Sequence, residues 1–286
     1  MKSIIKKLID KIKKLIYKLI ANVVPIMEII VLVGLAILPS KMELMNIIRE
    51  QLALPTDLEG VIVYYVFTQG DVVIGIALAV TVLFRIVRPL NKDKMFNKGV
   101  LYKNYPYWWY WLCAKILGYT KCNLVMVPIN MQFKLVINDT FTTFYTGDVE
   151  EKKEDDIEVI RDGKIENSDE INLIIADTYP IDKSQLPEVK KKLPTIKITR
   201  NNSIDHNRYK SDELVKNVVI EVGNLPVNSR KINIYATTNP ENTMNIAKKA
   251  FSSGERSNLD LVTVFQQGND PLRKFKEKGI VVYKRR

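Results

Sequence analysis

The sequence predicts an α-helical two-span membrane hairpin followed by a cytoplasmic Rossmann-like α/β domain with a mainly parallel sheet. Two apolar segments, from Leu19 to Leu38 and from about Val61 to Val87, are each long enough to cross a bilayer as a helix. From Ile171 onward, short Val- and Ile-rich stretches alternate with helix-like ones, which is typical of parallel strands joined by crossover helices. These observations separate a membrane part from a cytoplasmic part.

Composition divides the chain further into four segments. Residues 1–18 place apolar side chains at helical spacing with lysines between them, which predicts a basic amphipathic helix lying on an anionic membrane surface. Residues 19–90 form the predicted hairpin, residues 91–170 an aromatic-rich linker with a small β-rich region, and residues 171–286 the Rossmann-like sensor domain. Membrane lipids are therefore expected partners of the first two segments.

The distribution of basic residues predicts the orientation of the hairpin. Lysines crowd the amino-terminal flank, and Arg85, Arg88, Lys92, Lys94 and Lys98 lie near the end of the second span or just beyond it. The loop between the spans has few basic residues. By the positive-inside rule, both termini are cytoplasmic.

Acidic side chains interrupt the apolar segments. Glu28 is expected roughly halfway along the first span, and Gln69 and Asp71 near the middle of the second apolar segment. A charged carboxylate in hydrocarbon is costly, so such groups face protein or water. One interpretation is that hairpins pack as a ring and Glu28, Gln69 and Asp71 line a central pore. The other is that Asp71 caps the outer end of a span beginning at Val72, and that Glu28 is a protonated carboxyl hydrogen-bonded between helices.

The linker region contains the densest aromatic cluster of the chain, Tyr105, Tyr107, Trp108, Trp109, Tyr110 and Trp111. Anchoring at the membrane interface is favoured over stacking on nucleobases, because Trp and Tyr prefer the headgroup layer. Residues 122–139 are predicted to be extended, and residues 157–166 to form a hairpin around an Asp-Gly turn. Residues 184–193 and 271–278 are predicted to be helical connections between strands.

In doubly wound sheets, ligands bind beyond the carboxyl ends of the strands. The residues at those predicted ends are Asp177, Thr178, Arg200, Asn201, Asn202, Thr237, Thr238, Asn239, Gln266 and Gln267. Amide side chains can pair with base edges, and either Arg200 or the helix start near Asn242 could hold a phosphate. The alternative is that these are ordinary polar turn residues.

Motifs of catalysis are missing from the sequence. There is no phosphate-binding loop, no G-x-G-x-x-G after a strand and no G-x-S-x-G, and the chain has one histidine and two cysteines. Asp177 and Asp182 could serve a membrane-tethered nucleotide-processing enzyme, but they have no evident partner set. We therefore expect a binding protein that has no catalytic residues, metal site or cofactor.

A two-span hairpin joined to a Rossmann-like domain resembles the membrane effectors of bacterial anti-phage defence systems. The Hailong-type transmembrane channel is the nearest likeness, followed by the two-span effectors of cyclic-oligonucleotide-based defence. The resemblance implies a homo-oligomer, which we expect to be a tetramer, in the bacterial inner membrane. It also implies a nucleotide or single-stranded oligonucleotide messenger, made by a partner nucleotidyltransferase, that controls the pore. The Hailong-type likeness implies that this messenger is an oligodeoxyadenylate. No individual functional residue follows from it.

Overall fold

The computed structural model describes residues 22–43, 61, 70–99, 102–151, 156–201, 208–252, 258–268 and 270–285. They belong to two compact units, one of Met1–Lys94 with Leu112–Thr120 and the other of Met95–Trp111 with Lys121–Arg286. The basic helix predicted for residues 1–18, and the candidate residues Gln69 and Asn202, lie outside the described residues.

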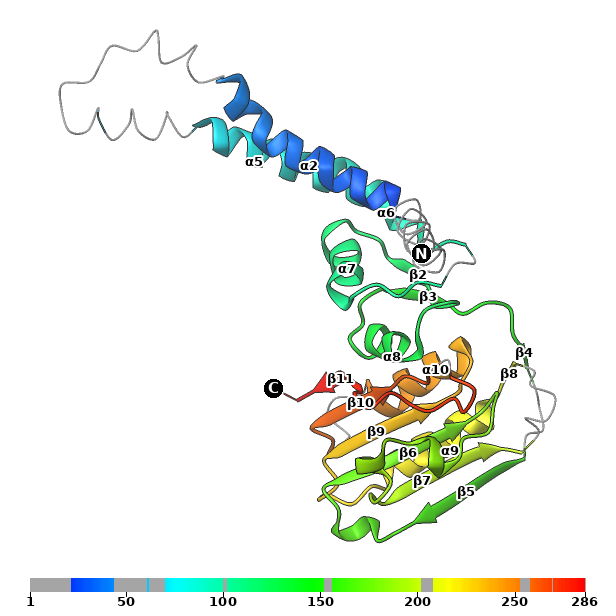
Figure 1. Ribbon diagram of the computed structural model, residues 1–286. Coiled ribbons are helices and arrows are strands. Elements are labelled where there is room, and N and C mark those ends of the chain that lie inside the picture. The colour runs from blue at the N-terminus through cyan, green and yellow to red at the C-terminus, as the bar shows by residue number, and fades with distance from the viewer. Residues whose placement is uncertain are drawn as a thin grey trace, which may run out of the picture. The chain divides into compact units, whose positions relative to one another are not determined.

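The first unit contains two helices that are long and apolar enough to cross a membrane (Figure 1). The first is α2, Val23–Met42. The second is made of α5, Gly70–Val82, a π-helical segment, Leu83–Val87, and α6, Arg88–Lys92. Apolar side chains along both helices are exposed, which suits a lipid environment better than water.

The two helices approach closely at Gly75. A Cβ atom added to Gly75 would lie 2.1 Å from the backbone oxygen of Ala36, so the contact between α2 and α5 requires a residue without a side chain. Small residues at such positions are a common feature of helix pairs in membranes, where packing rather than water exclusion drives association. The predicted pair of apolar helices is therefore present and packed.

The second unit is built on a six-stranded sheet with the order β11-β10-β9-β6-β7-β5. Its strands are β5, Ile157–Asp162; β6, Glu170–Ala176; β7, Thr195–Arg200; β9, Lys231–Ala236; β10, Leu261–Phe265; and β11, Ile280–Lys284. The four central strands pair in parallel, whereas β5 and β11 pair antiparallel to β7 and β10 at the two edges. The sheet is thus mixed, with the predicted parallel arrangement confined to its centre.

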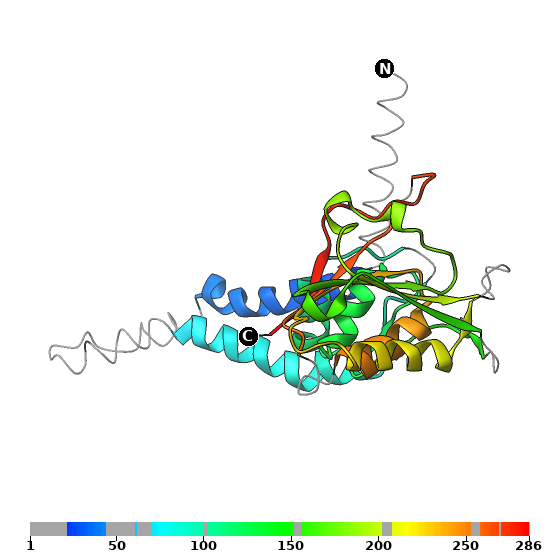
Figure 2. The same cartoon turned by 90° about the horizontal axis from the view of Figure 1, so that it is seen from below.

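Helices cover one face of this sheet (Figure 2). They include α9, Asp212–Gly223, capped by Ser211, and α10, Pro240–Ile246, capped by Asn239 and continued by the π-helical segment Ala247–Phe251. The helix α8, Ile129–Ile137, packs against α10 and contacts β10 and β11. Its position corrects the prediction of extended structure for residues 122–139, in which only Cys122 and Asn123, at the end of β2, Lys121–Asn123, belong to a strand.

The opposite face is covered by irregular chain. Ile174, Tyr235 and Phe265 of the sheet pack there against Ile181 and other side chains of the connecting segments. Residues 184–193, predicted as a helix, instead contribute to two short 3-10 turns, Lys183–Gln185 and Glu188–Lys190. Pro187 lies between the turns and prevents their joining into one helix. Residues 271–278 are also not helical; Phe275 forms an isolated bridge with Gln267.

A small parallel sheet precedes the large one. Its strands are β1, Met95–Phe96; β2; and β3, Thr143–Tyr145. The remaining short pair joins β4, Glu150–Glu151, to β8, Tyr209–Lys210. The predicted hairpin around Asp162 and Gly163 does not form, because β5 pairs with β7 and residues after the turn adopt a 3-10 turn, Ile165–Asn167.

The aromatic cluster is divided between core and surface. It forms the helix α7, Tyr107–Trp111, followed by a π-helical segment, Leu112–Ile116. Tyr110 is fully buried and makes an edge contact with Phe96, whereas Trp108 is 60% exposed and Trp111 44% exposed. Trp108 and Trp111 are thus the members of the cluster whose side chains are exposed enough to anchor at an interface.

Candidate functional site

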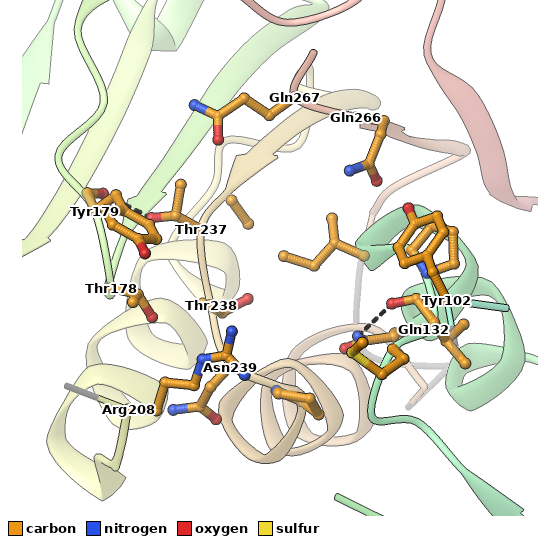
Figure 3. A pocket seen from close by; sticks show the side chains of 16 residues that line it. Tyr102, Gln132, Thr178, Tyr179, Arg208, Thr237, Thr238, Asn239, Gln266 and Gln267 are labelled. Carbon is orange, nitrogen blue, oxygen red and sulfur yellow. Dashed lines mark hydrogen bonds between the residues drawn. The ribbon is translucent and has the colours of Figure 1, made fainter. Parts of the chain in front are cut away.

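A cavity of about 310 Å³ lies where β6, β9 and β10 end. Six of the residues predicted from strand ends line it, and Figure 3 shows them around one space: Thr178, Thr237, Thr238, Asn239, Gln266 and Gln267. They meet because the carboxyl ends of neighbouring parallel strands open at the same edge of the sheet.

Asp177 and Arg200, also predicted at the site, are not among the cavity's lining residues. Both side chains are fully buried, and Arg200 Nε lies 2.8 Å from Asp177 Oδ1. Asn201 pairs with Asp156 through a 3.0 Å hydrogen bond on an exposed segment. These residues therefore lie beside the cavity rather than in its wall.

The buried carboxylate of Asp177 organises the chain under the cavity. Its Oδ2 accepts hydrogen bonds from Asn242 Nδ2 at 2.9 Å and from the backbone N–H of Asn239 at 3.3 Å. Burial raises the pKa of Asp177, and these donors together with the charge of Arg200 oppose that rise. The network joins the end of β6 to the start of α10.

The same two asparagines hold the segment that carries Arg208. Asn239 Nδ2 and Asn242 Nδ2 both donate to the carbonyl of Tyr209, at 2.7 and 2.9 Å. Arg208, next to Tyr209, lines the cavity. The backbone N–H of Asn242 is already bonded to Asn239 Oδ1, so the start of α10 does not offer this donor to a phosphate. Arg208, rather than Arg200, is the cationic side chain that lines this cavity.

Several lining residues lie in segments that no sequence pattern marked as part of a site. They include Tyr102, Met126, Gln132, Tyr179 and Arg208. Tyr102 and Tyr179 supply aromatic rings, and the guanidinium of Arg273 lies 4.2 Å from the ring centroid of Tyr179. Arg208, directly before β8, follows no predicted strand end, so no sequence pattern placed it at the site.

Unsatisfied amide atoms distinguish this cavity from an ordinary turn cluster. Gln132 Oε1, Gln266 Oε1 and Gln267 Nε2 are buried and have no hydrogen-bond partner among the residues that the structure describes. Buried polar atoms are normally paired with protein or water. These three atoms belong to residues that line the cavity, and their unused hydrogen-bonding capacity could be completed by ordered water or by a bound molecule.

The two acidic residues of the spans lie near opposite ends of the hairpin. Glu28 is in the second turn of α2, where its Oε2 accepts a 2.8 Å hydrogen bond from Asn91 Nδ2, near the end of α6. Asp71 lies in the first described turn of α5 and is buried. The expected midpoint position of Glu28 is thus wrong, because the helix extends from Val23 to Met42 rather than from Leu19 to Leu38.

Among solved structures, the chain is similar to the Acinetobacter baumannii Cap4 SAVED/CARF-domain containing receptor in complexes with two cyclic trinucleotides. The 2'3'3'-cAAA complex matches with 10% identity and a TM-score of 0.42 over 60% of this chain. The 3'3'3'-cAAA complex matches with 12% identity and a TM-score of 0.40 over 59% of this chain. Each match covers only 40% of the receptor chain, so this chain spans less than half of its length.

No curated protein matches the sequence. Residues 6–282 match the family model described as the SMODS- and Ubiquitin system-associated 2TM effector domain. The match extends over both apolar helices and the sheet domain, and it agrees with the resemblance to two-span effectors of nucleotide-signalled defence. The chain therefore belongs to the SMODS- and ubiquitin system-associated family of two-transmembrane effectors.

Proposed function

We propose that this protein is an oligomeric, ligand-gated channel of the bacterial inner membrane, with a cytoplasmic domain that binds a nucleotide or oligonucleotide messenger. The observation that carries the proposal is the cavity at the ends of β6, β9 and β10, with its unpaired buried amides. A concave site with few convergent polar groups, at the carboxyl edge of parallel strands, is typical of small-molecule binding.

The chemistry of the cavity suits a nucleotide. Tyr102 and Tyr179 offer faces on which a base can stack, and Arg208 offers a guanidinium for a phosphate. The glutamine amides offer donors and acceptors for a base edge. Membership in a family associated with messenger-synthesising nucleotidyltransferases supports an oligonucleotide, made by such a partner, as the ligand.

The membrane part supports a channel rather than a simple anchor. A simple anchor needs no polar side chain between its spans, yet Glu28 and Asn91 form a hydrogen-bonded pair there. In the proposed assembly, a tetramer, neighbouring hairpins enclose a wet passage with Glu28 towards one mouth and Asp71 towards the other. Lipids contact the exposed apolar side chains. The messenger sets the gate by binding the open and closed arrangements with different affinity.

A binding role is proposed in preference to an enzymatic one. The two carboxylates that could have served a hydrolytic site have other partners: Asp177 pairs with Arg200, and Asp182 caps the 3-10 turn that contains Gln185. Among the described residues, no group of three or more His, Cys, Asp or Glu side chains could hold a metal ion. These partners support a sensor whose cavity holds its ligand without turnover.

The test is to reconstitute the full-length protein in liposomes loaded with an ion-sensitive dye, and to titrate short cyclic and linear oligonucleotides while measuring binding and ion flux. The proposal predicts saturable binding, a ligand-dependent change in flux, and recovery of the ligand intact. Binding followed by breakdown of the ligand would favour the nucleotide-processing enzyme. Binding with no ion flux, either with or without the oligonucleotide, would contradict the channel and favour a simple membrane anchor.

A further inference from the structure

A cationic segment lies next to the cavity, in the connection between β10 and β11. Residues 270–278, the rim segment, contain four basic residues, and the side chains of all four are exposed: Arg273, Lys274, Lys276 and Lys278. The acidic residues of the rim segment are Asp270 and Glu277, so its formal charge is positive. An exposed excess of positive charge attracts anions.

Hydrogen bonds hold the rim segment against the cavity wall. The backbone N–H of Lys276 donates to the carbonyl of Gln266 at 3.0 Å, and Phe275 forms a bridge with Gln267. Both glutamines line the cavity. The backbone N–H of Phe275 also donates to the carbonyl of Gln185 at 2.9 Å. The position of the rim segment is therefore fixed relative to the cavity.

Arg273 of the rim segment stacks on an aromatic residue of the wall. Its guanidinium lies 4.2 Å from the ring centroid of Tyr179. Tyr179 lines the cavity, and Figure 3 shows it on the opposite side from Tyr102. The hydroxyl of Thr237, the residue after β9, donates to the Tyr179 carbonyl at 2.7 Å and fixes the backbone of this tyrosine. The stack brings a second cation to the edge of the cavity.

The backbone of Arg273 has a conformation that is uncommon for a residue with a side chain. Its φ is +49°, in the left-handed region. Its N–H donates to the carbonyl of Asp270 at 2.9 Å, which holds the turn in place. Such conformations persist where the surrounding structure fixes them, and they are frequent at ligand-binding sites. The turn therefore sets where the Arg273 guanidinium lies.

This guanidinium is not neutralised by a carboxylate. Arg273 forms no ion pair within the part of the chain that the structure describes. An arginine can stack on a ring through the face of its guanidinium and donate hydrogen bonds through the edge, in a geometry that matches a phosphate. Arg273 is thus positioned to bind a phosphate beside Tyr179.

The size of the cavity leaves part of an oligonucleotide outside it. Ligand cavities in proteins commonly measure about 300–1,000 Å³. At about 310 Å³, this one is at the lower limit of that range, so a ligand of two or more nucleotides has to extend beyond it. Arg208 lines the cavity, whereas Arg273 lies behind Tyr179 and is not part of the lining. Two separate cationic positions suit a ligand with two phosphates.

We propose that Arg273, stacked on Tyr179, forms an outer phosphate site that binds the phosphate of a second nucleotide unit beyond the cavity. Arg208 holds the phosphate of the unit inside. This inference rests on the proposed nucleotide-binding function. It adds that the messenger is recognised through at least two phosphates, one of which lies outside the cavity.

The test uses the full-length protein in nanodiscs of zwitterionic lipid, which offer no anionic headgroup to the rim segment. Mononucleotides and dinucleotides of each common ribonucleoside, all with a terminal 5'-phosphate, are titrated by calorimetry. We expect the dinucleotide of the best-binding base to bind more tightly than its mononucleotide. Arg273→Gln should weaken dinucleotide binding about 5- to 20-fold, a modest effect for a charge-assisted hydrogen bond because Arg273 is exposed. Mononucleotide binding should change less than about twofold.

Lys278→Gln is the matched control, because it removes one exposed positive charge from the same rim segment and leaves the stack on Tyr179 intact. It should keep the dinucleotide affinity within about twofold. The salt dependence of dinucleotide binding is a second readout, and it decides where the mononucleotide binds too weakly to be measured. Loss of one phosphate contact lowers the slope of log affinity against log salt by about 0.7, and we expect this decrease in Arg273→Gln alone.

Each outcome has a distinct meaning. Unchanged dinucleotide affinity and salt slope in Arg273→Gln would overturn the outer phosphate site and leave nucleotide binding in the cavity intact. Equal losses for the mononucleotide and the dinucleotide would overturn it too, because Arg273 would then act on the unit inside the cavity. Equal losses in Lys278→Gln would indicate a diffuse effect of charge, which also excludes a specific site. If no nucleotide binds the native protein, the proposed function fails and this inference fails with it.

Discussion

Asn91 donates a 2.8 Å hydrogen bond to the Glu28 carboxylate, joining the first apolar helix to the end of the second. The same Asn91 side chain donates to the Leu117 carbonyl at 3.1 Å, and its Oδ1 accepts from Lys94 Nζ at 3.3 Å. Asn91 is fully buried, so all of its polar atoms depend on these protein partners. A single amide thereby fixes α2, α6 and the segment after α7 to one another within the first unit.

Replacing Asn91 by Ala should loosen this junction. The change leaves the Glu28 carboxylate and the Leu117 carbonyl without their donor, and hydrogen bonds between membrane helices contribute about 0.6 kcal/mol on average and up to about 1.7 kcal/mol. Unfolding of the full-length protein in mixed micelles of increasing SDS content measures the loss. Asn245→Ala, on a half-exposed helix surface of the second unit, is the control. Equal midpoints for Asn91→Ala and the native protein would contradict this account of the junction.

Glycine at position 75 should be required for the close approach of α2 and α5. In Gly75→Ala the new methyl group would lie 2.1 Å from the Ala36 oxygen, so the helices must separate, at a cost of about 1–3 kcal/mol. Distances between spin labels on the two helices measure the separation. Gly34→Ala is the matched control, because a Cβ at Gly34 has no neighbour within 4 Å. An unchanged distance distribution in Gly75→Ala would show that the contact between Gly75 and Ala36 does not determine the separation of α2 and α5.

Acid should weaken the centre of the sheet through Glu170. Burial raises the pKa of this carboxyl, but hydrogen bonds from Lys190 and Asn233 and the charges of Lys190 and Lys231 outweigh burial, so the pKa is lowered overall. A lowered pKa in the folded protein contributes stability above the ordinary carboxyl pKa, and this contribution is lost as the pH falls through the folded-state value. The protection factors of β6 and β9 amides, which correct for the slower intrinsic exchange of amides in acid, should therefore fall at acidic pH.

The variant Glu170→Gln tests the assignment. At neutral pH its β6 and β9 amides should have lower protection factors than those of the native protein, and acidification should lower them further by a smaller amount. Glu188→Gln is the control, because Glu188 pairs with Lys191 on the surface with 79% of its side chain exposed, where ion pairs contribute little. If Glu170→Gln retains the full acid response, another carboxylate is responsible.

Removing the charge at Arg208 should weaken messenger binding. Arg208→Gln takes away the guanidinium that the proposal places at a phosphate, and charge-assisted hydrogen bonds of this kind contribute about 1.5–3 kcal/mol, so affinity should fall about 10- to 150-fold. Arg230→Gln removes one positive charge at the surface ion pair with Asp260 and controls for the change in net charge. Equal losses in both variants, measured by titration calorimetry, would point to a non-specific charge effect.

The sequence allowed the strand-end residues of the site to be predicted, because the end of an apolar run and the polar residues after it are local patterns. Thr237, Thr238 and Asn239 follow β9 immediately, and Gln266 and Gln267 follow β10. Parallel pairing of these neighbouring strands then brings both groups to one edge. The Asp177–Arg200 ion pair could not be predicted from the sequence. Both residues follow the last paired residues of β6 and β7, but their side chains are fully buried and contact each other rather than the cavity.

The α8 side of the cavity was missed for a different reason. Almost every residue of Ile129–Ile137 is buried, including Gln132, so the segment has no solvent face and no alternation that distinguishes a helix from a strand. Pro128 suggested an interrupted strand, whereas it stands at the N-cap of α8. Without the helix, nothing placed Gln132 near the strand ends, so this side of the cavity could not be predicted.

Conductance under control of a bound nucleotide is the central claim, and recordings from planar bilayers containing the full-length protein test it most directly. The account predicts discrete conductance steps whose open probability changes on adding or withdrawing a short oligonucleotide that binds the protein. It also predicts that an Arg208→Gln channel needs a higher ligand concentration for the same change. The absence of any conductance, both with and without a ligand that binds the protein in a separate measurement, would contradict it.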